Sequence, residues 1–150
     1  MKVFEGLEQL EAELGRHVWY SDWMEITQER IDAFAEATGD HQWIHVDPAR
    51  AAEGPYGRTI AHGYLTLSLL PVLGAEVMEI RGFAMMINYG VDKVRFPAPV
   101  PVGSRIRAGI ELTSLQRKSS GVQLNSLVTV EVEGSDRPAV VAETVRVMVE

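Results

Sequence analysis

The most constraining feature of the sequence is the apolar run Tyr64–Ile80, YLTLSLLPVLGAEVMEI. Its composition is typical of a helix, and a helix that is apolar on all sides belongs in the interior of a structure rather than on its surface. Pro71 has no amide hydrogen to donate, so we expect it to bend this helix or to end it early. The rest of the chain must therefore cover one buried helix.

Four segments in the C-terminal half are rich in β-branched residues and alternate in polarity, which is typical of strands. Stretches rich in proline, glycine and serine separate them, as expected of turns. Together the segments predict an antiparallel meander. We expect an α+β fold in which an antiparallel sheet wraps around the central apolar helix. The four segments are 83–96, 104–118, 121–134 and 139–150.

The N-terminal part predicts shorter elements. Apolar residues at spacings of three and four within Phe4–Leu14 indicate an amphipathic helix that Gly15 ends. A short strand is expected within residues 21–27. The next helix begins after Thr27, a typical N-cap, and ends at Gly39, a typical C-cap.

Composition limits the class of protein. The 150 residues carry a net charge of −7 and include no cysteine. The length is that of one domain, so we expect a single domain over residues 1–150. The acidic balance argues against a nucleic-acid surface, and no segment approaches the roughly 18 apolar residues of a membrane span. With no apolar leader and no thiol, we expect a cytoplasmic protein without nucleic-acid or membrane partners.

Ionisable side chains gather in the stretch Ala37–Ala51, ATGDHQWIHVDPARA, directly after the second predicted helix. From the residues alone, Asp40 is either a turn residue that bonds its own backbone or an acid within a functional site. His45 is either a satisfied, half-buried histidine or a functional base. Both interpretations remain open at this point.

A metal site is another use of paired histidines. His41 and His45 are four residues apart, but Gly39 and Pro48 disfavour a helix there, and no acidic residue at a known ligand spacing completes the set. We therefore predict no metal and no cofactor. A serine hydrolase is also unsupported, because the chain has no Gly-x-Ser-x-Gly elbow.

Three blocks of the chain carry a family resemblance. FAEATGDHQWIHVDPARA has an aromatic residue, a Gly-Asp pair, a histidine and a small residue at the family spacing, here Phe34, Gly39-Asp40, His45 and Ala51. GRTIAHGYLTLSLL and VRFPAPVPVGSRIR follow in matching order. The pattern resembles the MaoC-like dehydratases, the (R)-specific enoyl-CoA hydratases, and GDHQWIH is similar to their NodN-type branch. This resemblance implies a hot-dog fold, the sheet-around-helix architecture expected above.

The resemblance also implies an activity, hydration of trans-2-enoyl-CoA to (R)-3-hydroxyacyl-CoA or the reverse dehydration. The reaction needs a base for the attacking water, a proton for the α-carbon and a donor to the enolate-like oxygen. Asp40 and His45 are implied to share one water, and which of them is the formal base stays open. We expect the amide of Gly63 to be the oxyanion donor, because it begins the buried helix and glycine permits close approach. His62 is expected to orient this loop.

Asn88 is polar within the apolar segment AMMINYGVDKV, so it either satisfies a structural network or lines the pocket. We include it with Gly63 as a candidate for substrate binding. The substrate is expected to be an acyl-CoA or an acyl-carrier-protein thioester. A free sheet edge must be covered or paired, and the resemblance implies pairing into a homodimer or a dimer of dimers.

Two other functions compete with the hydratase. A hot-dog thioesterase shares the fold and the oxyanion donor but aims water at the carbonyl carbon. A non-catalytic acyl-thioester-binding subunit is the alternative from another class, and Gln42-Trp43 supports it because these residues replace the commoner Asn-Pro and would fill the pocket. Retention of Asp40 and His45 favours the hydratase, since a binding protein needs no acid–base pair.

Overall fold

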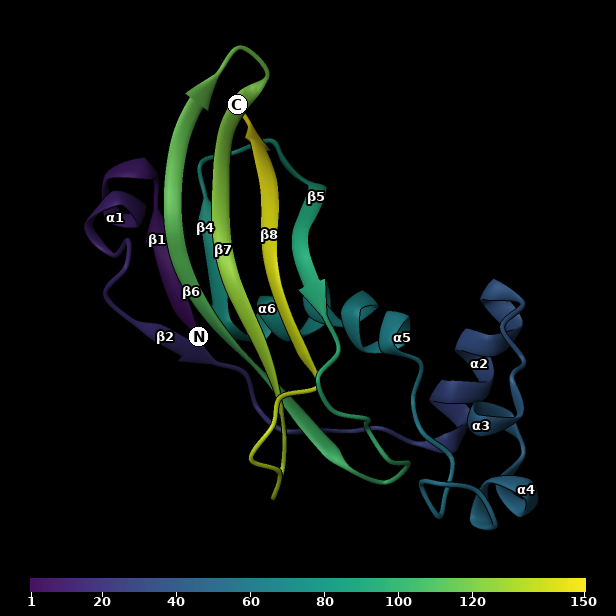
Figure 1. Ribbon diagram of the computed structural model, residues 1–150. Coiled ribbons are helices and arrows are strands. Elements are labelled where there is room, and N and C mark those ends of the chain that lie inside the picture. Colours follow the sequence, from purple (N-terminus) through teal and green to yellow (C-terminus); the bar gives the residue numbers. More distant parts are fainter.

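A curved antiparallel sheet and the helix pair that it wraps form the centre of the computed structural model, which describes residues 1–150 (Figure 1). The helices are α1 (Leu7–Ala12), α2 (Gln28–Thr38), α3 (Trp43–Val46), α4 (Pro48–Ala52), α5 (Gly63–Ser68) and α6 (Leu70–Val77). The strands are β1 (Lys2–Glu5), β2 (Val18–Tyr20), β3 (Met24–Glu25), β4 (Met78–Arg81), β5 (Met85–Arg95), β6 (Arg105–Lys118), β7 (Gly121–Val132) and β8 (Val140–Val149). The expected α+β architecture is confirmed.

The four long strands expected from the sequence are present as β5 to β8, but their order differs from a simple meander. The strands are arranged β2-β6-β7-β8-β5, and β3 also pairs with β6. Thus β5 pairs antiparallel with β8 and not with β6, the next strand in the chain. The proline-rich connection 97–103 leads from one side of the sheet to the other, and prolines cannot extend a strand because they lack the amide that a ladder needs.

The central helix is interrupted at the position expected from Pro71, since α5 ends at Ser68 and α6 begins at Leu70. Leu65 and Leu73 are buried against the concave face of the sheet. The expectation that the whole helix is interior is only partly met, because Tyr64 is 69% exposed and Val72 is 45% exposed. One side of the helix therefore remains open.

The predicted helix over Phe4–Leu14 is wrong at its beginning. Phe4 lies in β1, which pairs parallel with β4, and its partner in the register is Ile80. Full burial of the Phe4 side chain in this small second sheet outweighs the helical spacing, so α1 begins only at Leu7. Strand β4 could not be recognised from the sequence, because its apolar residues directly continue the apolar run of α6.

Helix α2 forms as predicted, and it positions the next loop. Thr27 accepts a hydrogen bond from the amide of Arg30 at 3.3 Å, and Gly39 ends the helix in the left-handed conformation with φ 81°. Figure 1 shows α2, α3 and α4 grouped at one end of the sheet, next to the beginning of α5. No helix of the structure has the length and apolar character needed to cross a membrane.

Candidate active site

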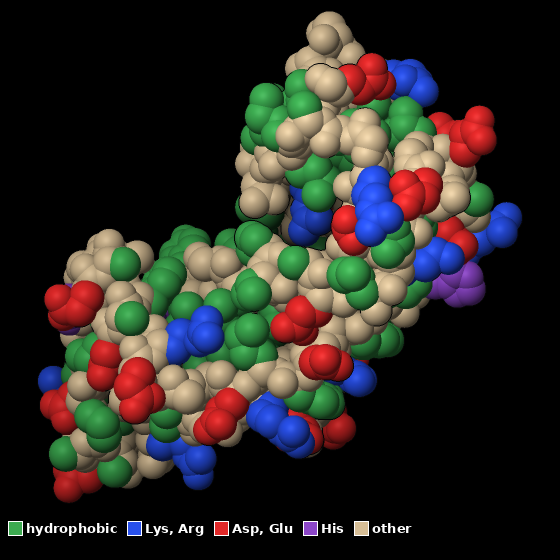
Figure 2. Space-filling model, turned by 180° about the vertical axis from the view of Figure 1, so that it is seen from behind, with side chains coloured by type: hydrophobic (Ala, Val, Ile, Leu, Met, Phe, Trp, Pro, Cys, Tyr) green, Lys and Arg blue, Asp and Glu red, His purple; other side chains and the backbone are tan.

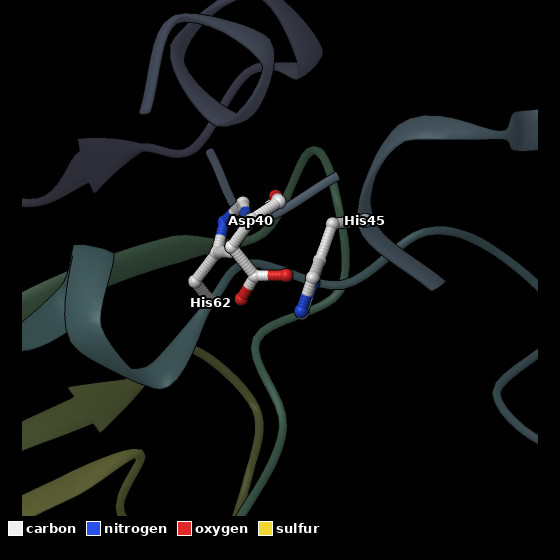
Figure 3. Close-up of side chains that lie close together, drawn as sticks. All are labelled: Asp40, His45 and His62. Carbon is white, nitrogen blue, oxygen red and sulfur yellow. Dashed lines mark hydrogen bonds between the residues drawn. The ribbon is translucent and has the colours of Figure 1, made fainter. Parts of the chain in front are cut away.

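Three side chains from separate segments meet where α2, α3 and α5 approach one another (Figure 3). Asp40 follows the C-cap of α2, His45 belongs to α3, and His62 directly precedes α5. A carboxylate oxygen and one ring nitrogen from each histidine lie within 4.8 Å of one another. Both histidines are buried and Asp40 is exposed. The fold therefore brings together the two residues expected to be catalytic, and it adds a third.

The hydrogen bonding of His45 leaves one ring nitrogen free. Its Nδ1 lies 2.7 Å from the main-chain oxygen of Ile60, and because a carbonyl only accepts, Nδ1 carries the proton. Nε2 then holds a lone pair. Burial lowers the pKa of His45 from its ordinary 6.5, although the bond to Ile60 and the charge of Asp40 act in the opposite direction. His45 is therefore neutral near pH 7, the state that a general base requires.

Asp40 combines the two interpretations that the sequence left open. One carboxylate oxygen accepts a hydrogen bond from the amide of Gln42 at 3.3 Å, which is the turn contact. Figure 3 shows the carboxylate directed toward the ring of His45. The turn thus holds the acid in place while part of the carboxylate remains free for chemistry.

His62 does more than the loop orientation expected of it. Its Nε2 lies 2.9 Å from the main-chain oxygen of Asp40, so Nε2 carries the proton. Its ring stacks on His45 with centroids 3.8 Å apart, and Phe34 packs against it at 4.9 Å. The Nδ1 atom of His62 is buried and has no hydrogen-bond partner. The only sequence signal for this third residue was its place in the His-Gly pair of the second block.

A cavity of about 310 Å³ opens beside His45. Gly63 and Thr66 line it together with a mostly apolar wall: Tyr56, Ile60, Ala61, Phe96, Pro97, Ala98, Pro99, Val100 and Ala139. Asp40 does not line the cavity, but its carboxylate lies close to the ring of His45, which does. The volume falls at the lower end of the range for small-molecule sites.

Gly63 has a structural reason to be glycine. A Cβ at this position would lie 2.9 Å from Cγ of Phe96, closer than side chains tolerate. Close packing of Phe96, rather than approach of a ligand, thus accounts for the missing side chain. The amide of Gly63 begins α5 next to His62, and the first amides of a helix have no acceptor within the helix.

Asn88 and Trp43 lie outside this cavity. Asn88 is on β5, where its partner in the register is Arg146 of β8, so the structure does not bring it to Asp40 and His45. Trp43 has Arg50 over its ring at 4.4 Å and closely approaches Gly54. The pocket-filling tryptophan that would support a non-catalytic subunit is therefore not observed.

His62 and Asp40 supply the ligand partners for His45 that the sequence spacing lacked, so spacing alone no longer speaks against a metal. A short helix, α3, forms in the region, against expectation, but it begins at Trp43 and leaves out His41, whose Nε2 contacts Glu36 at 2.8 Å. Two histidines and a carboxylate are a donor set that zinc or iron accepts. The rings of His45 and His62 are 24° from parallel and stacked, whereas ligands of one ion converge on it. The absence of a metal stays a prediction.

Comparison with known proteins decides the family. A family model described as the MaoC like domain matches residues 9–134. The chain belongs to the MaoC-like family. It is 56% identical over 146 residues to 3-hydroxyacyl-thioester dehydratase Z of Mycobacterium tuberculosis, and this alignment covers 97% of each chain. It is 43% identical to nodulation protein N of Rhizobium leguminosarum, over 95% of this chain and 91% of that protein.

Solved structures agree with this assignment. An R-hydratase from Pseudomonas aeruginosa superposes with a TM-score of 0.73 at 25% identity, over 92% of this chain and 83% of that one. The resemblance seen in the three motif blocks, the likeness to the NodN-type branch and the hot-dog fold are thus confirmed. So is the expectation of an enzyme of the hydratase and dehydratase class, since that is the activity named for the MaoC-like relatives.

Proposed function

We propose that this MaoC-like enzyme adds water to trans-2-enoyl-CoA, giving (R)-3-hydroxyacyl-CoA, and catalyses the reverse dehydration. The supporting observation is the free Nε2 of a neutral, buried His45, which lies beside the Asp40 carboxylate and lines the same cavity as Gly63. An acceptor pair beside a mostly apolar cavity suits a neutral water and a hydrophobic acyl group. We further propose that residues 1–150 act as one domain. A cytoplasmic location remains a prediction.

In the proposed reaction the water oxygen bonds to the β-carbon while one of its protons passes to the Asp40–His45 pair. The π electrons of the double bond move toward the thioester carbonyl, whose oxygen accepts a hydrogen bond from the amide of Gly63. A proton from the pair then bonds to the α-carbon, so that H and OH are added and the pair is regenerated.

Hydration of crotonyl-CoA, followed as loss of absorbance at the enoyl-thioester band, tests the proposal. Asp40→Asn and His45→Gln should each lower kcat by about 10²–10⁴. His41→Gln is the matched control, because His41 is exposed and its side chain pairs with the exposed Glu36. Chiral analysis should give the (R) alcohol. Release of free thiol together with crotonate, and no 3-hydroxyacyl product, would establish a thioesterase instead. Binding without either reaction would establish a non-catalytic subunit.

We also propose a homodimer, with a dimer of dimers as a further possible assembly, in which two copies pair through β5. This strand is at one end of the sheet order, and almost every residue along it is exposed. Its exposed apolar side chains are Met85, Met86, Ile87, Tyr89 and Val91. An unpaired apolar edge of this length favours strand addition, and a second copy offers the same edge. Whether the acyl group is carried by coenzyme A or by a carrier protein can be tested with both thioesters of one acid.

A further inference from the structure

The guanidinium of Arg146 lies between the sheet and the central helix without an acceptor. Arg146 lies two residues from both Thr144 and Met148 on β8, so the three side chains share one face of the strand, and Thr144 and Met148 are buried. A Cβ at Gly74 of α6 would lie 3.1 Å from its Nη2. No ion pair or hydrogen bond of this side chain is present, and burial lowers its pKa. A partly buried cation without a partner is costly, so an acceptor from outside the chain would stabilise it.

Two cavities flank Arg146 and make a crevice along the helix. One of about 390 Å³ and one of about 210 Å³ share Pro71, Asn88 and Arg146. Figure 2, which views the molecule from behind the sheet, shows a hollow where the sheet rises above the helical end, with hydrophobic side chains around it. The remaining lining is largely apolar or small: Leu67, Leu70, Gly74, Ala75, Met78, Ile80, Met86, Gly90, Val91 and Val145.

Other polar groups in the crevice already have partners. Ser68 donates to the main-chain oxygen of Tyr64 at 2.6 Å, and Glu79 is held by Arg81 at 2.8 Å. Asn88 lies directly opposite Arg146 across the strand pair, which places the two side chains within reach of one ligand group. Arg146 and Asn88 therefore carry side-chain donors in the crevice that no group of the chain accepts.

The cavity beside His45 and the crevice lie along successive parts of the interrupted central helix, α5 and α6, and they share no lining residue. Gly63 and Thr66 line the cavity with His45, and Leu67, Ser68 and Pro71 line the crevice. At 1.5 Å per residue, Ser68 to Pro71 lie about 8–12 Å from Gly63. An extended chain covers about 1.2 Å per bond, so the eighth carbon of an acyl group is about 9 Å from its carbonyl carbon. An acyl chain of that length, held at Gly63 and lying along α5, would end near Ser68 and Leu70, in the crevice that Arg146 also lines.

We propose that Arg146, assisted by Asn88, binds a carboxylate at the distal end of the acyl chain, so that the enzyme prefers dicarboxylic enoyl thioesters of about eight carbons. The inference rests on the proposed function for the location of the thioester. A guanidinium and a carboxylate form two parallel hydrogen bonds, and this pairing compensates the loss of water around both groups. A methyl end would displace that water without offering the guanidinium a hydrogen-bond acceptor.

The test compares trans-2-octenedioyl-CoA, which has a free carboxylate at carbon eight, with trans-2-octenoyl-CoA. In the wild type, kcat/KM for the carboxylate substrate should be about 10- to 100-fold higher, the range of a charged hydrogen-bonded pair. Arg146→Leu should reverse this preference, Arg146→Lys should retain part of it, and Asn88→Leu should reduce it. Arg137→Leu, which removes an exposed arginine from a loop, is the matched control and should keep the wild-type ratio. Because the ratio is taken within each variant, a partly unfolded preparation does not alter it.

Binding of the saturated thioesters octanedioyl-CoA and octanoyl-CoA, measured by calorimetry, separates the subsite from the reaction. If no enoyl thioester, crotonyl-CoA included, is hydrated but octanedioyl-CoA binds more tightly in an Arg146-dependent way, the proposed function fails and the subsite stands. Equal rates and equal affinities for the two eight-carbon acyl groups in the wild type would overturn the subsite. Dissociation of a wild-type dimer in Arg146→Leu, with the preference unchanged, would also overturn it by assigning the guanidinium to a subunit contact.

Discussion

The ring of His62 lies face to face with that of His45, with centroids 3.8 Å apart and planes 24° apart. The same imidazole donates through Nε2 to the main-chain oxygen of Asp40 at 2.9 Å. Its own main-chain oxygen accepts from the amide of Thr66 at 3.2 Å, in the first turn of α5. One buried side chain thus fixes the acid, the base and the entry to the helix whose first amide is the proposed oxyanion donor. We interpret His62 as a positioning residue.

The His62→Phe variant tests this role. Phenylalanine keeps a ring against His45 but removes the hydrogen bond to Asp40, so we expect kcat for crotonyl-CoA to fall about 10- to 100-fold with little change in KM. A purely structural role would instead lower the folded fraction and leave the kcat of the folded enzyme unchanged. His41→Phe, at an exposed histidine, is the control, and thermal melts of both variants complete the comparison.

Protonation of His45 should determine how kcat/KM falls on the acid side of the pH profile. Burial lowers its pKa, so the base form persists below pH 6.5, and kcat/KM should fall only as the pH drops through a midpoint below that value. Asp40 raises this pKa and His62 lowers it. In NMR titrations of the His45 ring, Asp40→Asn should therefore move the midpoint down and His62→Phe should move it up. A midpoint at or above 6.5 in the wild type would contradict this electrostatic account.

Sequence reasoning succeeded where the signal is local or carried by spacing. The caps Thr27 and Gly39, the interruption at Pro71 and the alternation of the long strands were all predictable, because each depends on residues close together in the chain. The pairing of β5 with β8 was not, because it depends on how the connection 97–103 crosses the fold.

The candidate site shows the same division between local and long-range signals. Asp40 and His45 share one motif, and the family spacing made them recognisable. His62 is seventeen positions beyond His45, and its stacking and its bond to the backbone of Asp40 appear only in three dimensions. The unpaired Arg146 is likewise invisible in the sequence, where it looks like any polar position of an alternating strand.

The packing of Gly63 against Phe96 predicts a specific failure and a specific rescue. Gly63→Ala would place a methyl group 2.9 Å from Cγ of Phe96, so the free energy of unfolding should fall by about 1–3 kcal/mol and activity should fall with it. Phe96→Leu in the same chain should recover most of the stability, measured by urea denaturation. If activity returns as well, the missing Cβ is needed for packing. Restored stability without activity would show that the bulk at residue 63 interferes with the substrate.

Chelation tests the proposal that the site works without a metal. Because Asp40 and His45 hold the water in the proposed reaction, treatment with EDTA followed by desalting should leave crotonyl-CoA hydration unchanged. Added Zn²⁺ should not stimulate it, and binding of the ion across Asp40, His45 and His62 should instead inhibit, since it would occupy the lone pairs that the water needs. Loss of activity on chelation that a divalent ion restores would contradict the proposed use of these residues.

The exposed edge of β5 gives the last prediction, on assembly. Ile87 is 43% exposed on this edge, and Val18 of β2, at the other end of the sheet order, is 46% exposed, so the two positions form a matched pair for charge insertion. If two copies pair through β5, Ile87→Lys should give a monomer by sedimentation at micromolar concentration, because it introduces a charge into an apolar interface, whereas Val18→Lys should remain dimeric. The crevice of Arg146 is bounded by Asn88 and Val91 of β5. Loss of the dimer should therefore lower activity on eight-carbon substrates more than on crotonyl-CoA. A wild-type monomer, or dissociation by Val18→Lys alone, would show that this edge is not the interface.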